Sequence, residues 1–172
     1  ALWTPLLKER LDKLVVEVLR EGYGIPVEDL TYARFGGAIQ LMAKLPRTSI
    51  RVDDLGDGAR YAVVMVMAAA LARRTALLIE EPESHQHPGG LAKALDMLLS
   101  LAKRNEIQLF ISTHSLELLR LLEVISHEKG LDMAAFFLER SEDGFVSVRH
   151  VKPGDRKLLE DLGLDVRFLD VI

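Results

Sequence analysis

Two adjacent glutamates directly follow a short apolar segment of this 172-residue chain. Residues 76–79 have the composition of a buried strand, and Glu80 and Glu81 come straight after them. In an open parallel sheet, ligands bind just beyond the carboxyl ends of the strands, where both carboxylates would lie. One carboxylate can hold magnesium, directly or through its waters, and the other can orient or deprotonate an attacking water. A strand that merely ends in solvated acids is the alternative interpretation.

A histidine follows the next apolar strand along the chain. Residues 107–112 are expected to form this strand, and His114 lies just beyond its end. The carboxyl ends of neighbouring parallel strands share one edge of a sheet, so His114 is expected to approach Glu81. A histidine there can donate a hydrogen bond to a phosphate oxygen or to the attacking water. A purely structural histidine is the alternative.

A glycine-rich turn precedes both strands. Residues 55–60 read Leu-Gly-Asp-Gly-Ala-Arg and open a long apolar helix, in which Asp57 is expected to be the cap. Free amides at a helix N-terminus attract anions, and glycines such as Gly56 and Gly58 let a phosphate approach the backbone. A simple capping turn is the alternative for this segment too.

The elements that must position these residues alternate between strands and helices. Such alternation implies parallel crossover units. Expected helices cover residues 58–74, 90–104 and 116–127, and expected strands cover 76–79, 107–112, 133–138 and 145–150, the last two joined by a turn at 142–144.

The N-terminal third of the chain has a different pattern. Residues 3–21 place leucines and valines at helical spacing, so we expect one helix that ends at Gly22 and Gly24. Residues 29–52 alternate in short stretches with turn residues between them, which predicts a small antiparallel meander. We therefore predict two subdomains in contact, residues 1–54 and residues 55–172.

Composition narrows the class of protein. With 49% hydrophobic residues the chain suits a globular domain, and a net charge of −4 gives no overall basic field for nucleic acid, so any such contact would be local or supplied by a partner. The chain has no cysteine, which excludes disulfides and fits the reducing cytoplasm. The longest apolar run, residues 61–72, is shorter than the roughly 20 residues needed to cross a bilayer.

Taken together, residues 55–60, 76–88 and 111–115 resemble the ATP-binding-cassette (ABC) class of P-loop ATPases. The closest resemblance is to AAA-type ATP-binding proteins related to the overcoming-lysogenization-defect nucleases. A more distant one is to chromosome-maintenance and DNA-repair ATPases. This resemblance implies the C-terminal portion of a three-layer, P-loop NTPase-like α/β fold with a mainly parallel sheet, accompanied here by the N-terminal helix and meander.

The resemblance also implies a role for each motif. Glu80 would be the Walker B carboxylate near Mg²⁺, Glu81 the catalytic glutamate and His114 the switch histidine. The signature, which contacts the γ-phosphate of ATP bound by another subunit, would be Leu55, Gly56, Asp57, Gly58 and Ala59. The implied partner is a second copy of the chain in an ATP sandwich, or a chain that carries the P-loop lobe.

Two departures from the family pattern affect this interpretation. The usual signature is Leu-Ser-Gly-Gly-Gln, whereas here Gly56, Asp57 and Ala59 replace the serine, the first glycine and the glutamine. In addition, a P-loop needs a glycine followed by lysine, and no glycine from Gly22 to Gly163 precedes a lysine. We expect the P-loop to precede residue 1 or to come from a partner, and the isolated chain to be inactive.

Two other functions stay open at this point. His85 and His87, beside Glu83, could bind a transition metal as in some metal-dependent hydrolases. Alternatively, the chain is a non-catalytic module for dimerisation or partner docking. The process served, whether DNA repair, phage defence or transport, does not follow from these motifs.

Overall fold

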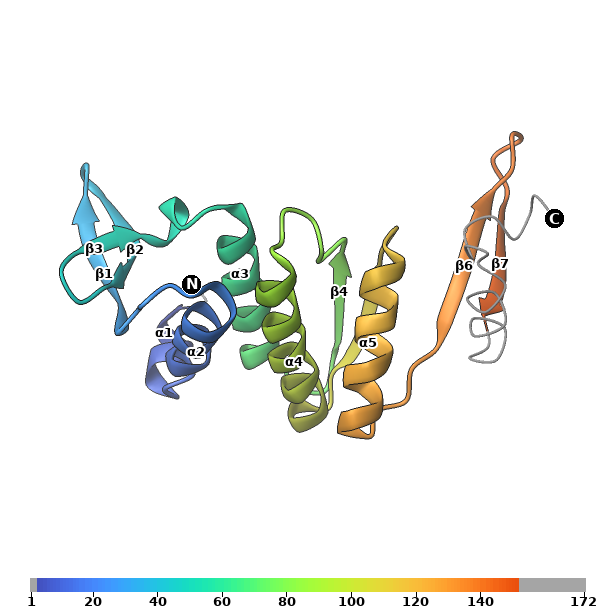
Figure 1. The fold of residues 1–172 in the computed structure, drawn as a ribbon, viewed down its shortest axis with the longest axis horizontal. Coiled ribbons are helices and arrows are strands. Elements are labelled where there is room, and N and C mark those ends of the chain that lie inside the picture. Colours follow the sequence, from blue (N-terminus) through green and yellow to red (C-terminus); the bar gives the residue numbers. More distant parts are fainter. Residues whose placement is uncertain (1–2, 152–172) are drawn as a thin grey trace. The chain divides into compact units, whose positions relative to one another are not determined.

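The computed structural model describes residues 3–151, and the chain divides into two compact units after Leu131 (Figure 1). The first contains α1 (Trp3–Lys8), α2 (Asp12–Tyr23), β1 (Asp29–Phe35), β2 (Ala38–Lys44), β3 (Ser49–Arg51), the 3-10 helix η1 (Val52–Asp54), α3 (Asp57–Leu71), β4 (Ala76–Glu80), α4 (Pro88–Asn105), β5 (Gln108–Ser112) and α5 (Leu116–Lys129).

The N-terminal segment forms two helices, so the prediction of one continuous helix over residues 3–21 is wrong. Arg10 has a φ of 58°, a left-handed conformation that ends α1 before α2 begins. The break places Leu6 in the core while α2 buries its own stripe, including Val15 and Leu19. Left-handed Gly24 then ends α2, because its backbone N–H reaches the carbonyl of Leu19.

The predicted antiparallel meander is confirmed. β1 pairs with β2, and β2 pairs with β3, all antiparallel. Gly36 and Gly37 have φ angles of 57° and 88°, and two consecutive positive φ values suit the tight turn between β1 and β2. The boundary predicted after residue 54 stays a prediction.

Helix α3 begins with an unusual cap. Gly56 is the N-cap residue, with a φ of 92°, and no side chain caps the helix. The expectation that Asp57 caps it is wrong, because Asp57 is the first helical residue and its carboxylate pairs with Arg60 at 2.9 Å. The rest of the helix is rich in alanine, valine and methionine and is largely buried.

Strands β4 and β5 are parallel, as the crossover pattern predicted, with helix α4 as the connection. Their register pairs Leu78 with Phe110 and Glu80 with Ser112. On one face Ile79 is buried, whereas on the other Leu78 is 76% exposed and Phe110 is 50% exposed. Parallel sheets are normally covered on both faces, so this apolar face is unusual among the described residues.

The second unit contains β6 (Ala135–Arg140) and β7 (Val146–Val151), which pair as an antiparallel hairpin. Ser141 closes the turn through its backbone N–H to the carbonyl of Phe145 at 2.9 Å. The predicted hairpin is therefore confirmed, with its strands one or two residues later than expected. Within residues 3–151 no helix is long and apolar enough to cross a membrane.

Candidate functional site

Glu80 and Glu81 lie at the carboxyl end of β4, where the sheet stops. Glu80 is the last paired residue of the strand, and the backbone N–H of Glu81 donates to the carbonyl of Ser112 at 2.9 Å. Glu81 has a φ of 43°, so the chain leaves the strand conformation at this residue. The two carboxylates are adjacent in sequence, but Glu80 belongs to the strand and Glu81 has a positive φ. Each carboxylate can therefore take a separate partner.

His114 lies beside Glu81. Its Nε2 atom is 3.5 Å from Oε1 of Glu81, and the imidazole is 88% exposed whereas the carboxylate is 44% exposed. The pair forms because β4 and β5 are parallel neighbours that end at the same edge. A water that contacts both groups could donate to the carboxylate and accept from the imidazole.

Hydroxyl groups hold the loops on both sides of this pair. Ser84 donates to Oε2 of Glu81 at 3.1 Å. Thr113 donates to Oε1 of Glu83 and accepts the backbone N–H of Ser115 at 2.9 Å. Thr113, which directly precedes His114, is thus bonded to the loop that carries Glu81.

Helix α3 reaches the same edge of the sheet through Tyr61. The Tyr61 hydroxyl donates to the backbone carbonyl of Glu80 at 2.7 Å. Burial, and then the negative charges of the three nearby glutamates, raise the pKa of Tyr61. The phenol therefore stays a hydrogen-bond donor at neutral pH and connects the predicted signature helix to the end of β4.

The two glycines of the predicted signature are required for different reasons. Gly56 needs its positive φ of 92°, and a Cβ atom there would meet nothing within 4 Å. At Gly58 a Cβ atom would lie 2.5 Å from the carbonyl oxygen of His85. Gly56 therefore has open space before it, where a phosphate could approach, whereas Gly58 permits contact with the loop after β4.

The remaining members of the predicted signature surround these glycines. Leu55 is half-buried, with its N–H bonded to the carbonyl of Val52 at 3.2 Å, and Ala59 is buried in the first turn of α3. Asp57 is exposed and paired with Arg60. The Asp57 carboxylate therefore contacts the Arg60 side chain of its own helix.

His85 and His87 have structural explanations. His85 has a φ of 61° in the turn after the glutamates. His87 is the N-cap of α4, where its Nδ1 accepts the N–H of Gly89 at 3.3 Å. No group of three or more metal-binding side chains that could hold an ion occurs among residues 3–151.

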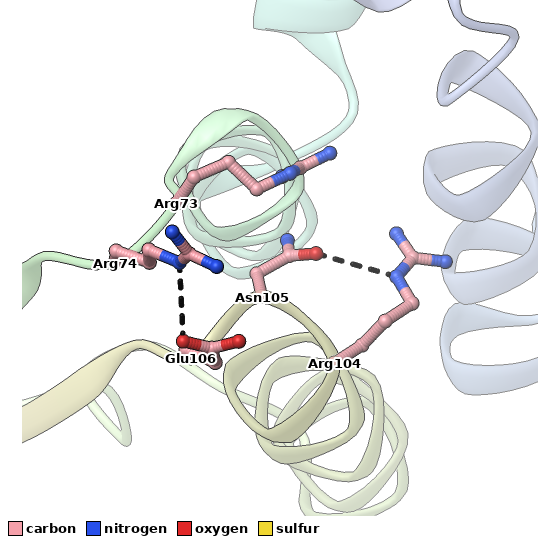
Figure 2. A pocket seen from close by; sticks show the side chains of 5 residues that line it. All are labelled: Arg73, Arg74, Arg104, Asn105 and Glu106. Atoms are coloured by element: carbon pink, nitrogen blue, oxygen red, sulfur yellow. Dashed lines mark hydrogen bonds and ion pairs between the residues drawn. The ribbon is translucent and has the colours of Figure 1, made fainter.

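Figure 2 shows a pocket at the other end of β4 and β5, where the two strands begin. Its lining residues precede β4 and β5 rather than follow them: Arg73, Arg74, Arg104, Asn105 and Glu106. Arg73 donates to the carbonyl of Ala70 at 2.6 Å, and Asn105 donates to that of Ala69 at 2.9 Å. Cations and amides commonly bind free carbonyls at helix C-termini, so we assign this pocket a structural role.

Several side chains around the site were not predicted from the sequence. Ser84 and Thr113 could have been noticed, since each is a hydroxyl residue within three positions of a predicted site residue. Tyr61 lies one helical turn into α3 and has no motif of its own. Tyr23 is the least predictable, because its contacts are with residues far along the chain.

Comparison with known proteins identifies the fold and then the family. A solved structure from a study of ATP-driven dimerization and DNA-stimulated activation of SMC ATPases matches with a TM-score of 0.60 and 13% identity, over 96% of this chain and 99% of that chain. The chain therefore has a P-loop NTPase-like α/β fold. Residues 7–119 match the AAA ATPase domain family, and the chain belongs to this family.

An uncharacterized protein of Methanocaldococcus jannaschii is 28% identical over 113 residues, which is 66% of this chain and 99% of that protein. The resemblance to AAA-type and SMC-like P-loop ATPases, inferred from the motifs, is therefore confirmed. The family makes ATPase chemistry the general expectation for the protein.

Proposed function

We propose that this chain is the part of an ABC-type ATPase that supplies the signature, the Walker B and catalytic glutamates and the switch histidine. The observation that carries the proposal is the pair formed by Glu81 and His114, 3.5 Å apart at the carboxyl edge of a parallel sheet. Ligands bind at this edge in open α/β sheets. The signature residues are Leu55, Gly56, Asp57, Gly58 and Ala59.

Glu81 and His114 have complementary roles in this proposal. Glu81 accepts a proton from the attacking water or orients it, and His114 donates to that water or to the γ-phosphate. The Ser84 hydroxyl keeps one oxygen of Glu81 occupied, so the other faces His114. Both catalytic residues thereby act on the same side of the nucleotide.

Glu80 is the residue that would hold Mg²⁺, directly or through a water. Its side chain is exposed and shares a sheet face with Leu78, at the edge where the nucleotide would lie. Mg²⁺ needs one or two carboxylates besides phosphate oxygens and water, so a single glutamate fits this ion. The bound ion would supply charge neutralisation of the phosphates.

The P-loop comes from a lobe outside these residues, either another segment of the protein or a partner chain. The open sheet face of Leu78 and Phe110 supports this inference, because parallel sheets are covered on both faces. A lobe placed there completes the three-layer arrangement with a mainly parallel sheet. It also brings a phosphate-binding loop to the face that presents Glu80.

The signature acts on ATP held by another subunit, so the complete protein is a homodimer when ATP is bound, or pairs with a chain that carries the P-loop. Gly56, which is unobstructed, supplies the free backbone for that contact. The boundary after residue 54 and a cytoplasmic location belong to the proposal as well. Nucleic acid does not belong to it, because the net charge of −4 gives no overall basic field for phosphate backbones.

A non-catalytic docking module is the second candidate. The observation that favours it is the apolar face of β4 and β5, which would bind a partner whether or not ATP were hydrolysed. The side-chain arrangement around Glu81 favours catalysis instead, since a docking surface needs neither the Ser84 hydrogen bond nor the His114 pair.

The test uses the complete protein with its P-loop and compares Glu81→Gln with Glu106→Gln, a matched change at the opposite edge of the same sheet. ATP hydrolysis should fall on the order of 100-fold or more in Glu81→Gln, with ATP still bound. Light scattering should show that this variant doubles its mass when ATP is added. Hydrolysis at the unmutated rate by Glu81→Gln would overturn the assignment, and Glu106→Gln should hydrolyse ATP normally.

A further inference from the structure

Three elements meet where α3 begins. The Tyr23 hydroxyl, at the end of α2, donates to Oε1 of Gln86 in the loop after the glutamates. Gln86 Nε2 in turn donates to the carbonyl oxygen of Gly58 at 3.1 Å, and the Tyr23 oxygen lies 3.3 Å from the same carbonyl. A short polar chain therefore connects α2, the loop and the first turn of the signature helix.

Helix α2 gives Tyr23 a fixed position. A Cβ atom added to Gly90 would lie 2.6 Å from the Tyr23 ring, so the ring packs directly on the backbone of α4. Lys93, on the next turn of α4, forms ion pairs of 2.7 Å with both Glu17 and Glu21 of α2. The phenol hydroxyl is therefore presented from two helices that pack on each other.

Close backbone packing supports the same junction. Gly58 lacks the Cβ atom that would collide with the carbonyl oxygen of His85, and Gln86 is the residue that follows His85. The loop and the start of α3 consequently touch through backbone as well as through the Gln86 side chain. A small displacement of Gln86 would therefore move the turn that contains Gly56 and Gly58.

Glu81 is positioned by other groups. Its side chain is bonded to Ser84 and its backbone to Ser112, and neither contact involves Gln86. The side chain of Gln86 is bonded to Tyr23 and Gly58, and its backbone N–H donates to the carbonyl of Glu83 at 3.1 Å. Loss of the side-chain bonds should accordingly disturb the signature while leaving the Glu81 carboxylate in place.

We propose that Tyr23 and Gln86 are positioning residues that set the signature turn for the nucleotide held by the partner subunit. The inference rests on the proposed ATPase function and deepens it. Helix α2 thereby contributes to positioning the signature, because it carries Tyr23 at one end of the chain of hydrogen bonds.

The first test measures steady-state hydrolysis by the complete protein with Tyr23→Phe or Gln86→Met, and with Tyr32→Phe in β1 as the matched tyrosine control. Tyr23→Phe keeps the ring on Gly90 and removes the hydroxyl. We expect turnover to fall about 5- to 10-fold for Tyr23→Phe and more for Gln86→Met. ATP affinity of the monomer should change by less than about twofold, since the P-loop supplies it.

The second test mixes Gln86→Met with Glu81→Gln at equal concentrations. In a mixed dimer, one composite site combines the intact Glu81 of the Gln86→Met subunit with the intact signature of the Glu81→Gln subunit. We expect that site to recover hydrolysis to about a quarter of the unmutated rate, because half of the dimers are mixed and each has one working site. A protein that had merely lost its fold could not be rescued in this way.

Absence of recovery, with both variants folded and dimeric, would overturn the proposal, because Gln86 would then act on its own subunit's Glu81. Unmutated turnover in Gln86→Met would overturn it as well. Failure of the proposed function has a different result: Glu81→Gln would by itself hydrolyse ATP at the unmutated rate or fail to dimerise with ATP. The two failures are therefore distinguishable.

Discussion

The imidazole of His114 and the carboxylate of Glu81 come from two neighbouring strands that end at the same edge, and their Nε2 and Oε1 atoms are 3.5 Å apart. The contact exists because β4 and β5 are parallel and in register up to Glu80 and Ser112. Each residue follows the last paired residue of its strand by one or two positions. The pair is thus a consequence of sheet topology rather than of local sequence.

The first prediction concerns how this pair differs from Glu80 in the complete protein. His114→Ala removes a donor to the γ-phosphate or water, so turnover should fall while magnesium-dependent ATP binding persists, as in Glu81→Gln. Glu80→Gln should instead weaken magnesium-dependent binding as well as turnover. ATP affinity with and without Mg²⁺, together with single-turnover hydrolysis, checks both. Normal metal dependence in Glu80→Gln would contradict the assignment of Glu80.

The second prediction separates a glycine that is required by contact from one that is not. Gly58→Ala would place a methyl group 2.5 Å from the carbonyl oxygen of His85, so backbone must move, at a cost of about 1–3 kcal/mol. Gly89→Ala would meet its nearest neighbour, the His87 ring, at 3.5 Å, so it should be neutral or slightly stabilising in a helix. Urea unfolding of both variants measures the difference. Equal stability of the two variants would show that the loop containing His85 can shift its backbone at little cost in free energy.

The elements that place Glu81 and His114 could be predicted from the sequence, because the pattern of apolar and polar residues indicates strands and helices. Apolar runs ended by polar residues indicated β4 and β5, and a helix between two strands indicated a parallel pair. The break at Arg10 could not be predicted, since a left-handed arginine has no sequence signal. Nor could the hydrogen bond between Tyr23 and Gln86, because 63 residues separate them and neither belongs to a motif.

The capping error at Asp57 has a similar physical origin. Aspartate before an apolar helix favours a cap assignment, but Gly56, with its φ of 92°, is the N-cap, so the helix starts one residue earlier than a capping aspartate would require. The backbone conformation that Gly56 permits thus outweighed the tendency of aspartate to cap a helix. The correction matters for function, since the Asp57 carboxylate pairs with Arg60 on its own helix.

The third prediction is a pH dependence that arises from Tyr23. Burial raises the pKa of Tyr23 from 10.0 to about 12. Well below pH 10 the phenol is protonated in both states and its stabilising effect is fully present. Between pH 10 and about 12 the unfolded chain loses the proton first, so the free energy of unfolding falls as pH rises.

Tyr23→Phe lacks this phenol, so it isolates the contribution from other alkaline effects. The difference in free energy of unfolding between the unmutated chain and Tyr23→Phe should narrow from pH 9 to pH 11.5. Urea unfolding at several pH values measures it. A difference that stays constant over this range would mean that the phenol titrates alike in both states.

The fourth prediction tests whether a lobe covers the open sheet face, using one substitution in two contexts. Leu78 is 76% exposed in this chain, so Leu78→Ala should change the stability of the isolated chain by less than about 0.5 kcal/mol. If the P-loop lobe packs on β4 and β5, Leu78 is buried in the complete protein, where the same change should cost about 2–5 kcal/mol. Ile39→Ala, at a position 67% exposed near the β1–β2 turn, is the control and should be small in both. Urea unfolding of the chain and of the complete protein gives the comparison. A small effect of Leu78→Ala in both would mean that nothing covers this face, and the P-loop would then have to reach Glu80 without packing on the sheet.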